Sequence, residues 1–186
     1  MDWKRTAPVA FNSAMSGEYP MKLASRMLLA AVPVALLGAS ASATAESQRI
    51  TDPLRFFEGR TESISTIKVI ARKAYRSRTA GRGEIGRDGI LHLVQQVLED
   101  GRPAYDRRWR MRQVGPRRFT GTMSEAIGPV IVDEVGGRFR FRFKMKGNLS
   151  IEQWLTPLSG TAARSSVTIR KLGLKVGRSE GTIRKL

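Results

Sequence analysis

One stretch of the sequence alternates a cation with a large apolar residue without interruption. It consists of Arg138-Phe139-Arg140-Phe141-Arg142-Phe143-Lys144-Met145-Lys146. Successive side chains of a β-strand point to opposite faces, so a strand would gather the apolar groups on one face and the cations on the other. A helix would scatter the same residues around its axis and place guanidinium groups beside phenyl rings. The stretch therefore predicts a strand with one dry and one wet face, as antiparallel sheets have.

Further short segments with strand character follow one another along the chain. They include residues 61–71, 90–98, 102–114 and 118–123, with turn signals such as Asp88-Gly89 between them. We expect residues 73–78 and 83–87 to form two short strands, and a bend at 173–177 to precede a last strand at 180–186. About nine or ten strands at this spacing are typical of all-β sandwiches and barrels.

A sheet of this size usually removes its free edges by closing on itself. We therefore expect an all-β fold, namely a single antiparallel, closed or nearly closed barrel of about 8–10 strands. The paired aromatics Phe56-Phe57, followed by Gly59, are expected at the barrel floor. A barrel of this size is filled by its own side chains or is just wide enough for one small ligand.

The N-terminal segment has the features of a secretory signal peptide. Lys22 and Arg26 precede an apolar run over residues 27–37, and small residues follow up to Ala45. The run is shorter than the roughly 20 residues that cross a bilayer, so a permanent anchor is the weaker alternative. We expect cleavage after about Ala45, a periplasmic location and no transmembrane span in the mature protein. The start codon is either Met1 or Met21.

This processing predicts a simple domain organisation. Residues 1–45 would be the N-terminal extension and signal peptide, residues 46–55 a lead-in, and residues 56–186 one barrel domain. The sequence contains no cysteine, so an exported domain would depend on core burial for its stability. The absence of cysteine also removes the residue that lipid attachment requires.

The chain is strongly basic, with a formal net charge of +17. In a periplasmic setting such a charge favours anionic lipids as partners, and in the cytoplasm it would favour nucleic acids. We expect two arginine rows on neighbouring strands to form an anionic-surface contact with envelope lipids; alternatively they only solubilise the outer face. The rows are Arg108, Arg110, Arg112, Arg138, Arg140 and Arg142. We expect no nucleic-acid binding, because the phenylalanines lie opposite the cations and offer no exposed stacking platform beside them.

The sequence holds few residues for catalysis or metal binding. It has one histidine, His92, whereas metal sites need three or four clustered ligands, so we expect no metal, no cofactor and no enzymatic activity. The remaining cofactor hypothesis makes His92 an axial haem ligand inside the barrel. The alternative is a partly buried strand histidine that is satisfied by a hydrogen bond.

Several motifs resemble those of a known family. They are the stretch from Asp52 to Gly59, Trp109-Arg110-Met111, the stretch from Phe119 to Thr122, Gln153-Trp154-Leu155, and the stretch from Ile169 to Gly177. With these the chain resembles the proteobacterial domain-of-unknown-function family 3833, whose members are exported, often lipidated, lipocalin-like proteins. The resemblance implies a lipocalin-like barrel and export, but no mechanism. The chain departs from the family at residues 60–64 and 156–160, so we expect a different ligand from that of the family, or none.

These observations lead to two functional hypotheses. The first is an exported lipocalin-like barrel that binds a small apolar or amphiphilic ligand in its interior. The ligand-binding residues would then be Trp109, Met111, Phe139, Phe141, Phe143 and Met145. The second is a basic, envelope-associated interaction protein with a filled barrel, which contacts anionic lipid and holds no ligand.

Overall fold

The structure is a computed structural model that describes residues 49–186. The predicted signal peptide lies outside the described residues, as do residues 46–48 of the lead-in. No helix within the described residues has both the length and the apolar character that a bilayer span requires.

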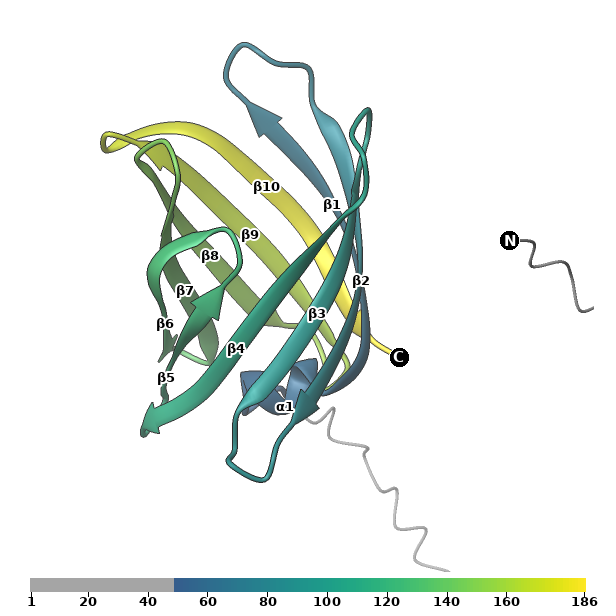
Figure 1. Ribbon diagram of the computed structural model, residues 1–186, viewed down its shortest axis with the longest axis vertical. Coiled ribbons are helices and arrows are strands. Elements are labelled where there is room, and N and C mark those ends of the chain that lie inside the picture. Colours follow the sequence, from purple (N-terminus) through teal and green to yellow (C-terminus); the bar gives the residue numbers. More distant parts are fainter. Residues whose placement is uncertain (1–48) are drawn as a thin grey trace, which may run out of the picture. The chain divides into compact units, whose positions relative to one another are not determined.

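Within residues 49–186, ten antiparallel strands close into one barrel, which confirms the predicted fold class (Figure 1). Each strand pairs with the next one in the sequence, and β1 also pairs with β10, so the sheet has no free edge. The elements are α1 (Pro53–Phe57), β1 (Gly59–Val69), β2 (Tyr75–Ile85), β3 (Leu91–Glu99), β4 (Tyr105–Gly115), β5 (Arg118–Met123), β6 (Ala126–Val135), β7 (Arg138–Met145), β8 (Leu149–Pro157), β9 (Ala162–Lys171) and β10 (Leu174–Lys185).

The alternating stretch forms β7, as its pattern predicts. Phe139 and Phe141 are buried inside the barrel, whereas Arg138 and Arg142 are exposed outside it. The side chains separate in this way because a closed sheet has one dry concave face and one wet convex face.

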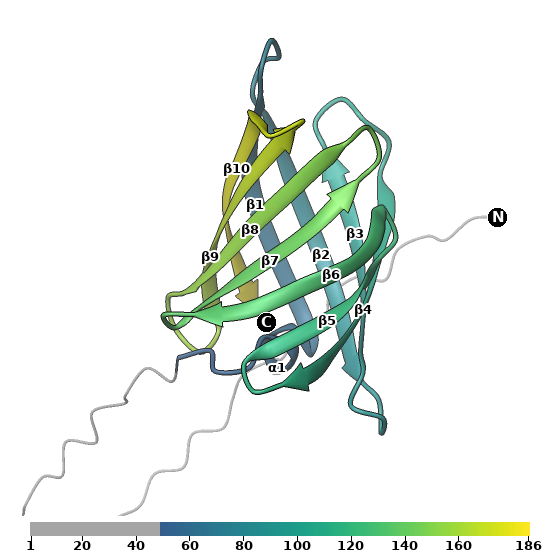
Figure 2. The same cartoon turned by 90° about the vertical axis from the view of Figure 1, so that its left-hand side faces the viewer.

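A short helix, α1, closes one end of the barrel (Figure 2). Asp52 caps the helix because its Oδ1 accepts a hydrogen bond from the backbone N–H of Leu54 at 2.7 Å, and Pro53 suits the first helical position. Phe56 and Phe57 are buried, with ring centroids 5.0 Å apart, so the predicted floor is confirmed. The helix itself was not expected, since five residues are too few for a helical period to show.

Residues 73–78 and 83–87 do not form two strands, because β2 runs without a break from Tyr75 to Ile85. Gly81 and Gly83 suggest an interruption of the strand, yet both are buried and both remain paired with β3 in the regular antiparallel register. A Cβ atom at Gly83 would overlap the carbonyl oxygen of Phe57, so this glycine lets α1 approach the sheet. The glycines serve close packing rather than a turn.

The expected bend at 173–177 and short last strand at 180–186 are also wrong. Leu172 and Gly173 make a tight hairpin turn, and β10 begins immediately after it at Leu174. The pairing register with β9 shifts between Lys175 and Gly177, so the irregularity at Gly177 is a bulge within a continuous strand.

The apolar core occupies the end of the barrel next to α1. Its members are Ile50, Leu54, Phe56, Phe57, Leu91, Leu93, Met111, Phe119, Met123, Val130, Val132, Phe139, Phe141, Leu155, Ala163 and Ile183. Figures 1 and 2 place the β1–β2 and β9–β10 hairpins at the opposite end. The core therefore seals one end, and the interior beyond it is free for a site.

Candidate ligand-binding cavity

The barrel encloses a cavity of about 590 Å³ above its core. The cavity extends from Phe57 on α1 to Tyr75, Glu99 and Tyr105, which lie at the strand ends of the opposite rim. Its volume falls within the range of pockets that hold small molecules. The barrel is thus hollow, not filled as the second hypothesis requires.

One side of the cavity is apolar and aromatic. Trp109 of β4 and Phe143 of β7 meet edge to face, with ring centroids 5.9 Å apart and planes at 88°. Met123, Met145 and Ile151 extend this wall. The indole N–H of Trp109 donates to Oε1 of Gln95 at 2.8 Å, so its one polar group is satisfied and its ring faces the cavity.

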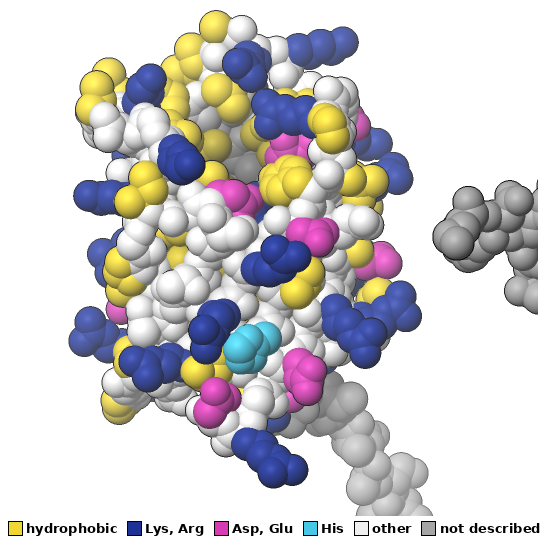
Figure 3. All heavy atoms as spheres, in the orientation of Figure 1, with side chains coloured by type: hydrophobic (Ala, Val, Ile, Leu, Met, Phe, Trp, Pro, Cys, Tyr) yellow, Lys and Arg dark blue, Asp and Glu magenta, His cyan; other side chains and the backbone are white. Residues whose placement is uncertain are grey.

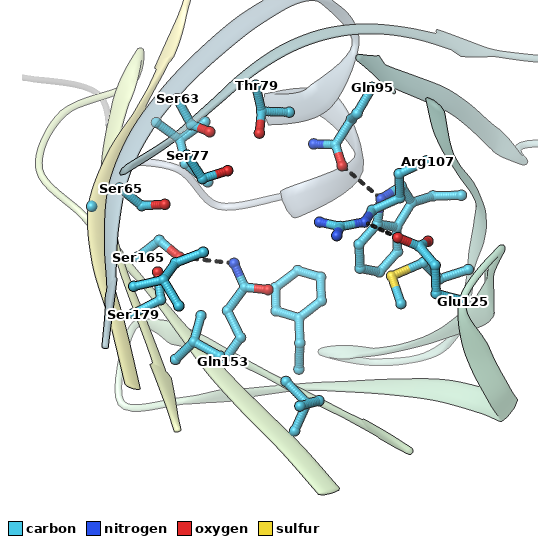
Figure 4. Close-up of a pocket in the computed structure, with 18 of the residues that line it drawn as sticks. Ser63, Ser65, Ser77, Thr79, Gln95, Arg107, Glu125, Gln153, Ser165 and Ser179 are labelled. Carbon is cyan, nitrogen blue, oxygen red and sulfur yellow. Dashed lines mark hydrogen bonds and ion pairs between the residues drawn. The ribbon is translucent and has the colours of Figure 1, made fainter. Parts of the chain in front are cut away.

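Hydroxyl groups cover another part of the lining at the middle of the barrel (Figure 4). We call this group the hydroxyl belt, and it consists of Ser63, Ser65, Ser77, Thr79, Ser165 and Ser179. β1 and β2 each contribute two residues, at alternate positions because only those face inward, and β9 and β10 contribute one each. Gln153 donates from Nε2 to Oγ of Ser165 at 2.8 Å. Among the residues drawn in Figure 4, the other five belt hydroxyls have no such bond.

Charged and phenolic side chains meet where the cavity opens. We call Glu99, Arg102, Tyr105, Arg107 and Glu125 the mouth cluster. Arg102 pairs with Glu99 at 2.7 Å, and Arg107 pairs with Glu125 at 2.9 Å. Arg107 also donates from Nη2 to the Tyr105 hydroxyl at 2.9 Å. The charges therefore balance within the cluster, which holds one side of the opening in place.

The two tyrosines at the opening are protonated donors at neutral pH. Burial raises the pKa of Tyr105 above the usual value for a phenol, and the neighbouring Arg107 partly offsets this rise. Burial, followed by the charge of Glu99, also raises the pKa of Tyr75. The Tyr105 hydroxyl donates to Oε1 of Glu99 at 3.5 Å, whereas the Tyr75 hydroxyl can donate a hydrogen bond to a ligand acceptor at the cavity mouth.

Five of the six predicted ligand-binding residues line the cavity. They are Trp109, Met111, Phe141, Phe143 and Met145. The sixth, Phe139, faces the barrel interior but does not line the cavity: it is 1% exposed and packs against Phe119 in the core below, with ring centroids 6.5 Å apart. Position along the strand explains the difference, because Phe139 lies at the end of β7 that enters the sealed floor.

The two predicted arginine rows do not lie on neighbouring strands. Arg108, Arg110 and Arg112 belong to β4, the other three belong to β7, and both β5 and β6 lie between. The β7 row is also engaged on the outer face of the sheet. The guanidinium group of Arg138 lies 4.4 Å from the Trp154 ring centroid, and Arg140 and Arg142 approach Asp133 at 3.6 and 2.6 Å. The two rows therefore form no single patch.

The lone histidine does not reach the cavity. His92 is exposed on the outer face of β3, where Figure 3 shows it among charged side chains. A haem held by His92 inside the barrel is therefore excluded by its direction. Within residues 49–186, no three His, Cys, Asp or Glu side chains cluster closely enough to hold a metal ion.

The hydroxyl belt is the part of the site that the sequence did not reveal. Ser63, Ser65 and Ile67 share the inner face of β1, but Ile64 lies on the outer face and is 58% exposed. The apolar residues of this strand therefore occupy both faces, so the alternation of apolar and polar residues in the sequence does not show which face points inward. The pairing of β1 with β10 and β2 decides it. Small polar residues at alternate positions were the only available signal.

Comparison with known proteins shows a similarity of fold and no similarity of sequence that would identify a family. No family model and no curated protein matches the sequence, so the resemblance to family 3833 stays a prediction. The S-type phycobiliprotein lyase CpeS from Guillardia theta superposes with a TM-score of 0.60 at 9% identity, over 72% of this chain and 90% of that one. A protein of unknown function from domain-of-unknown-function family 3598 of Nostoc punctiforme gives 0.53 at 10% identity. That match covers 78% of this chain and about half (53%) of the other protein. The chain is thus a lipocalin-like barrel.

Proposed function

We propose that this lipocalin-like barrel is an exported carrier that binds one small amphiphilic molecule in its cavity. The observation that supports the proposal most strongly is the hollow interior of about 590 Å³, with an aromatic wall and a hydroxyl belt in the same cavity. Pockets for small molecules combine a mainly apolar lining with a few polar groups that orient the ligand. Export rests on the predicted signal peptide.

The lining also indicates the chemistry of the ligand. The rings of Trp109 and Phe143 suit a hydrocarbon skeleton, since burying apolar surface is the main source of affinity in such pockets. A purely apolar ligand would leave the belt hydroxyls and the Gln153 amide without new partners, which costs binding free energy. We therefore expect an apolar body that carries a few hydroxyl, carbonyl or carboxyl groups.

The proposed activity is binding rather than catalysis. General bases in enzymes are most often histidines, and the only histidine lies on the outer face of β3. The mouth cluster contains carboxylates, but Glu99 and Glu125 are each paired with an arginine. Their arrangement supports the opening and leaves the interior to the ligand.

A fluorescent naphthylamine probe tests whether the cavity binds apolar molecules. We expect N-phenylnaphthylamine to bind saturably, with increased fluorescence, and Ser65→Phe to lower its affinity about tenfold or more. The reason is that Ser65 points into the cavity, where a phenyl ring would take up volume that the probe needs. A fluorescence titration of the purified protein measures both affinities.

The adjacent residue provides a matched control. Thr66 lies on the outer face of β1, so Thr66→Phe adds the same ring outside the barrel and should leave probe affinity unchanged. Equal affinity for both variants, or no saturable binding by the unmodified protein, would contradict the proposed function. If the probe binds as expected, mass spectrometry of an organic extract of the purified protein would identify the natural ligand.

A further inference from the structure

Three hairpins at the open end of the barrel form a continuous basic surface. We call residues 68–76, 144–150 and 170–178 the basic rim; together they contain ten Lys or Arg and no Asp or Glu. The hairpins are neighbours, because β1 pairs with β10 and β8 pairs with β9, and Ile70 donates its N–H to the Val176 carbonyl at 2.9 Å. None of these ten cationic side chains has an ion-pair partner within residues 49–186.

The same rim exposes large apolar side chains. Leu172 is 77% exposed, Leu174 is 74% and Ile70 is 66%, more than any other large apolar side chain in the described part of the chain. In Figure 3, apolar and basic side chains gather together at the end of the barrel where the β1–β2 and β9–β10 hairpins lie. A single exposed apolar side chain is ordinary, but these two leucines and one isoleucine lie on adjacent hairpins among unpaired cations. They form a patch that suits a partner with both apolar and anionic groups.

The backbone at Leu172 shows that this leucine is not there to stabilise the turn. Leu172 has φ 49° and Gly173 has φ 84°, so both central residues of the two-residue hairpin are left-handed. Such turns favour Asn, Asp or Gly, because other side chains are strained at positive φ. A leucine that is both strained and exposed breaks two local preferences at once, and breaks of this kind concentrate at functional positions.

The rest of the opening has a different character. The hairpins that join β3 to β4 and β5 to β6 carry Glu99, Asp100 and Glu125, two of which belong to the mouth cluster. The opening is therefore basic and apolar on one side and charge-balanced on the other. A second copy of this chain would bring two basic rims together and repel, so charge complementarity favours an anionic partner.

We propose that the basic rim docks the open end of the barrel onto an anionic lipid bilayer. The lysines and arginines would lie among the anionic head groups while Leu172, Leu174 and Ile70 enter the boundary with the acyl chains. The cavity mouth then faces the membrane. The docked barrel would take its ligand directly from the bilayer, and this second step rests on the proposed function. The docking itself does not depend on it.

Vesicle binding by charge-matched variants tests the docking surface. The purified protein is titrated with vesicles of phosphatidylcholine alone and of phosphatidylcholine with phosphatidylglycerol, and binding is measured by co-sedimentation. We expect binding only to the anionic vesicles, weakening steeply with salt. The combined change Lys73→Gln, Lys171→Gln and Lys175→Gln should lower the affinity about a hundredfold, or about fivefold for each cation removed.

The β4 arginine row provides the matched control. Arg108→Gln, Arg110→Gln and Arg112→Gln remove the same charge from the outer face of β4, away from the basic rim. We expect this variant to lose less than about threefold in affinity, since only the general attraction is reduced. Equal losses in the two triple variants, or a larger loss in the control, would show that the basic rim is not the docking surface.

The strained leucine permits a test in which stability and binding change in opposite directions. Leu172→Asn places a residue that tolerates positive φ in the turn, so the Tm should rise by about 2–4 °C. The same change removes an inserting side chain and should weaken binding to anionic vesicles about tenfold or more. If vesicle affinity is unchanged, insertion is disproved. If Leu172→Asn instead dissociates a dimer seen by sedimentation, the rim is a contact between copies and the docking proposal fails.

The two proposals fail separately. Probe titrations without vesicles should give the same N-phenylnaphthylamine affinity for the rim variants and the unmodified protein, because the changed side chains lie outside the cavity. A protein that binds anionic vesicles but no probe would refute the proposed carrier function and leave docking standing. A protein that binds the probe but no anionic vesicles would refute docking alone.

Discussion

Phe139→Ala is expected to lower the free energy of unfolding by about 3–5 kcal/mol, the usual cost of truncating a fully buried phenylalanine. Phe139 is 1% exposed and packs edge to face on Phe119, so alanine would leave a void that the closed sheet cannot collapse to fill. Urea unfolding followed by tryptophan fluorescence measures the change, with the slope of the transition as a check on two-state behaviour.

Phe143→Ala is the matched comparison on the same face of the same strand. Phe143 is only half-buried and borders the cavity, so its truncation enlarges an existing space and should cost about 1–2 kcal/mol. It should also weaken probe binding, whereas the folded fraction of Phe139→Ala should bind the probe normally. Similar stability losses in the two variants would contradict the division of the interior into a sealed core and an open cavity.

The second large effect is expected at Gly83, where the floor helix meets the sheet. A single added methyl group in Gly83→Ala would overlap the carbonyl oxygen of Phe57, which is backbone and cannot rotate away. We expect a loss of about 2–3 kcal/mol, because α1 must shift from the barrel end. Hydrogen exchange should show the effect locally, at the N–H of Glu58 that donates to the Leu54 carbonyl at 3.0 Å.

Gly115→Ala is the control for the general effect of adding a methyl group to a strand glycine. Among residues 49–186, apart from its two chain neighbours, no atom lies within 4 Å of the position that its Cβ would take, so the stability of the protein should change by less than about 0.5 kcal/mol. If Gly83→Ala is equally well tolerated, the close contact of α1 with β2 does not stabilise the floor. Faster exchange at Glu58 without a loss of global stability would show that α1 opens independently of the barrel.

The residue pattern of the sequence determined the fold class and the direction of the clearest side chains. The alternation over residues 138–146 placed Phe141 and Phe143 inside and the arginines outside, because successive side chains of a strand point to opposite faces of the sheet. Trp109 and Met111 followed from the same period in β4. The paired aromatics of the floor were also visible, although the helix that carries them was too short to show a period.

Only the tertiary structure decided which inward side chains form a core and which line a cavity. Phe139 and Phe143 are equivalent in the sequence, yet their distance from α1 makes one of them core and the other a cavity wall. The hydroxyl belt and the basic rim arise in the same way, since each gathers residues that barrel closure brings together from strands far apart in the chain. Strand periodicity specifies a face, whereas height in the barrel and neighbours across it depend on register and closure, which are long-range properties.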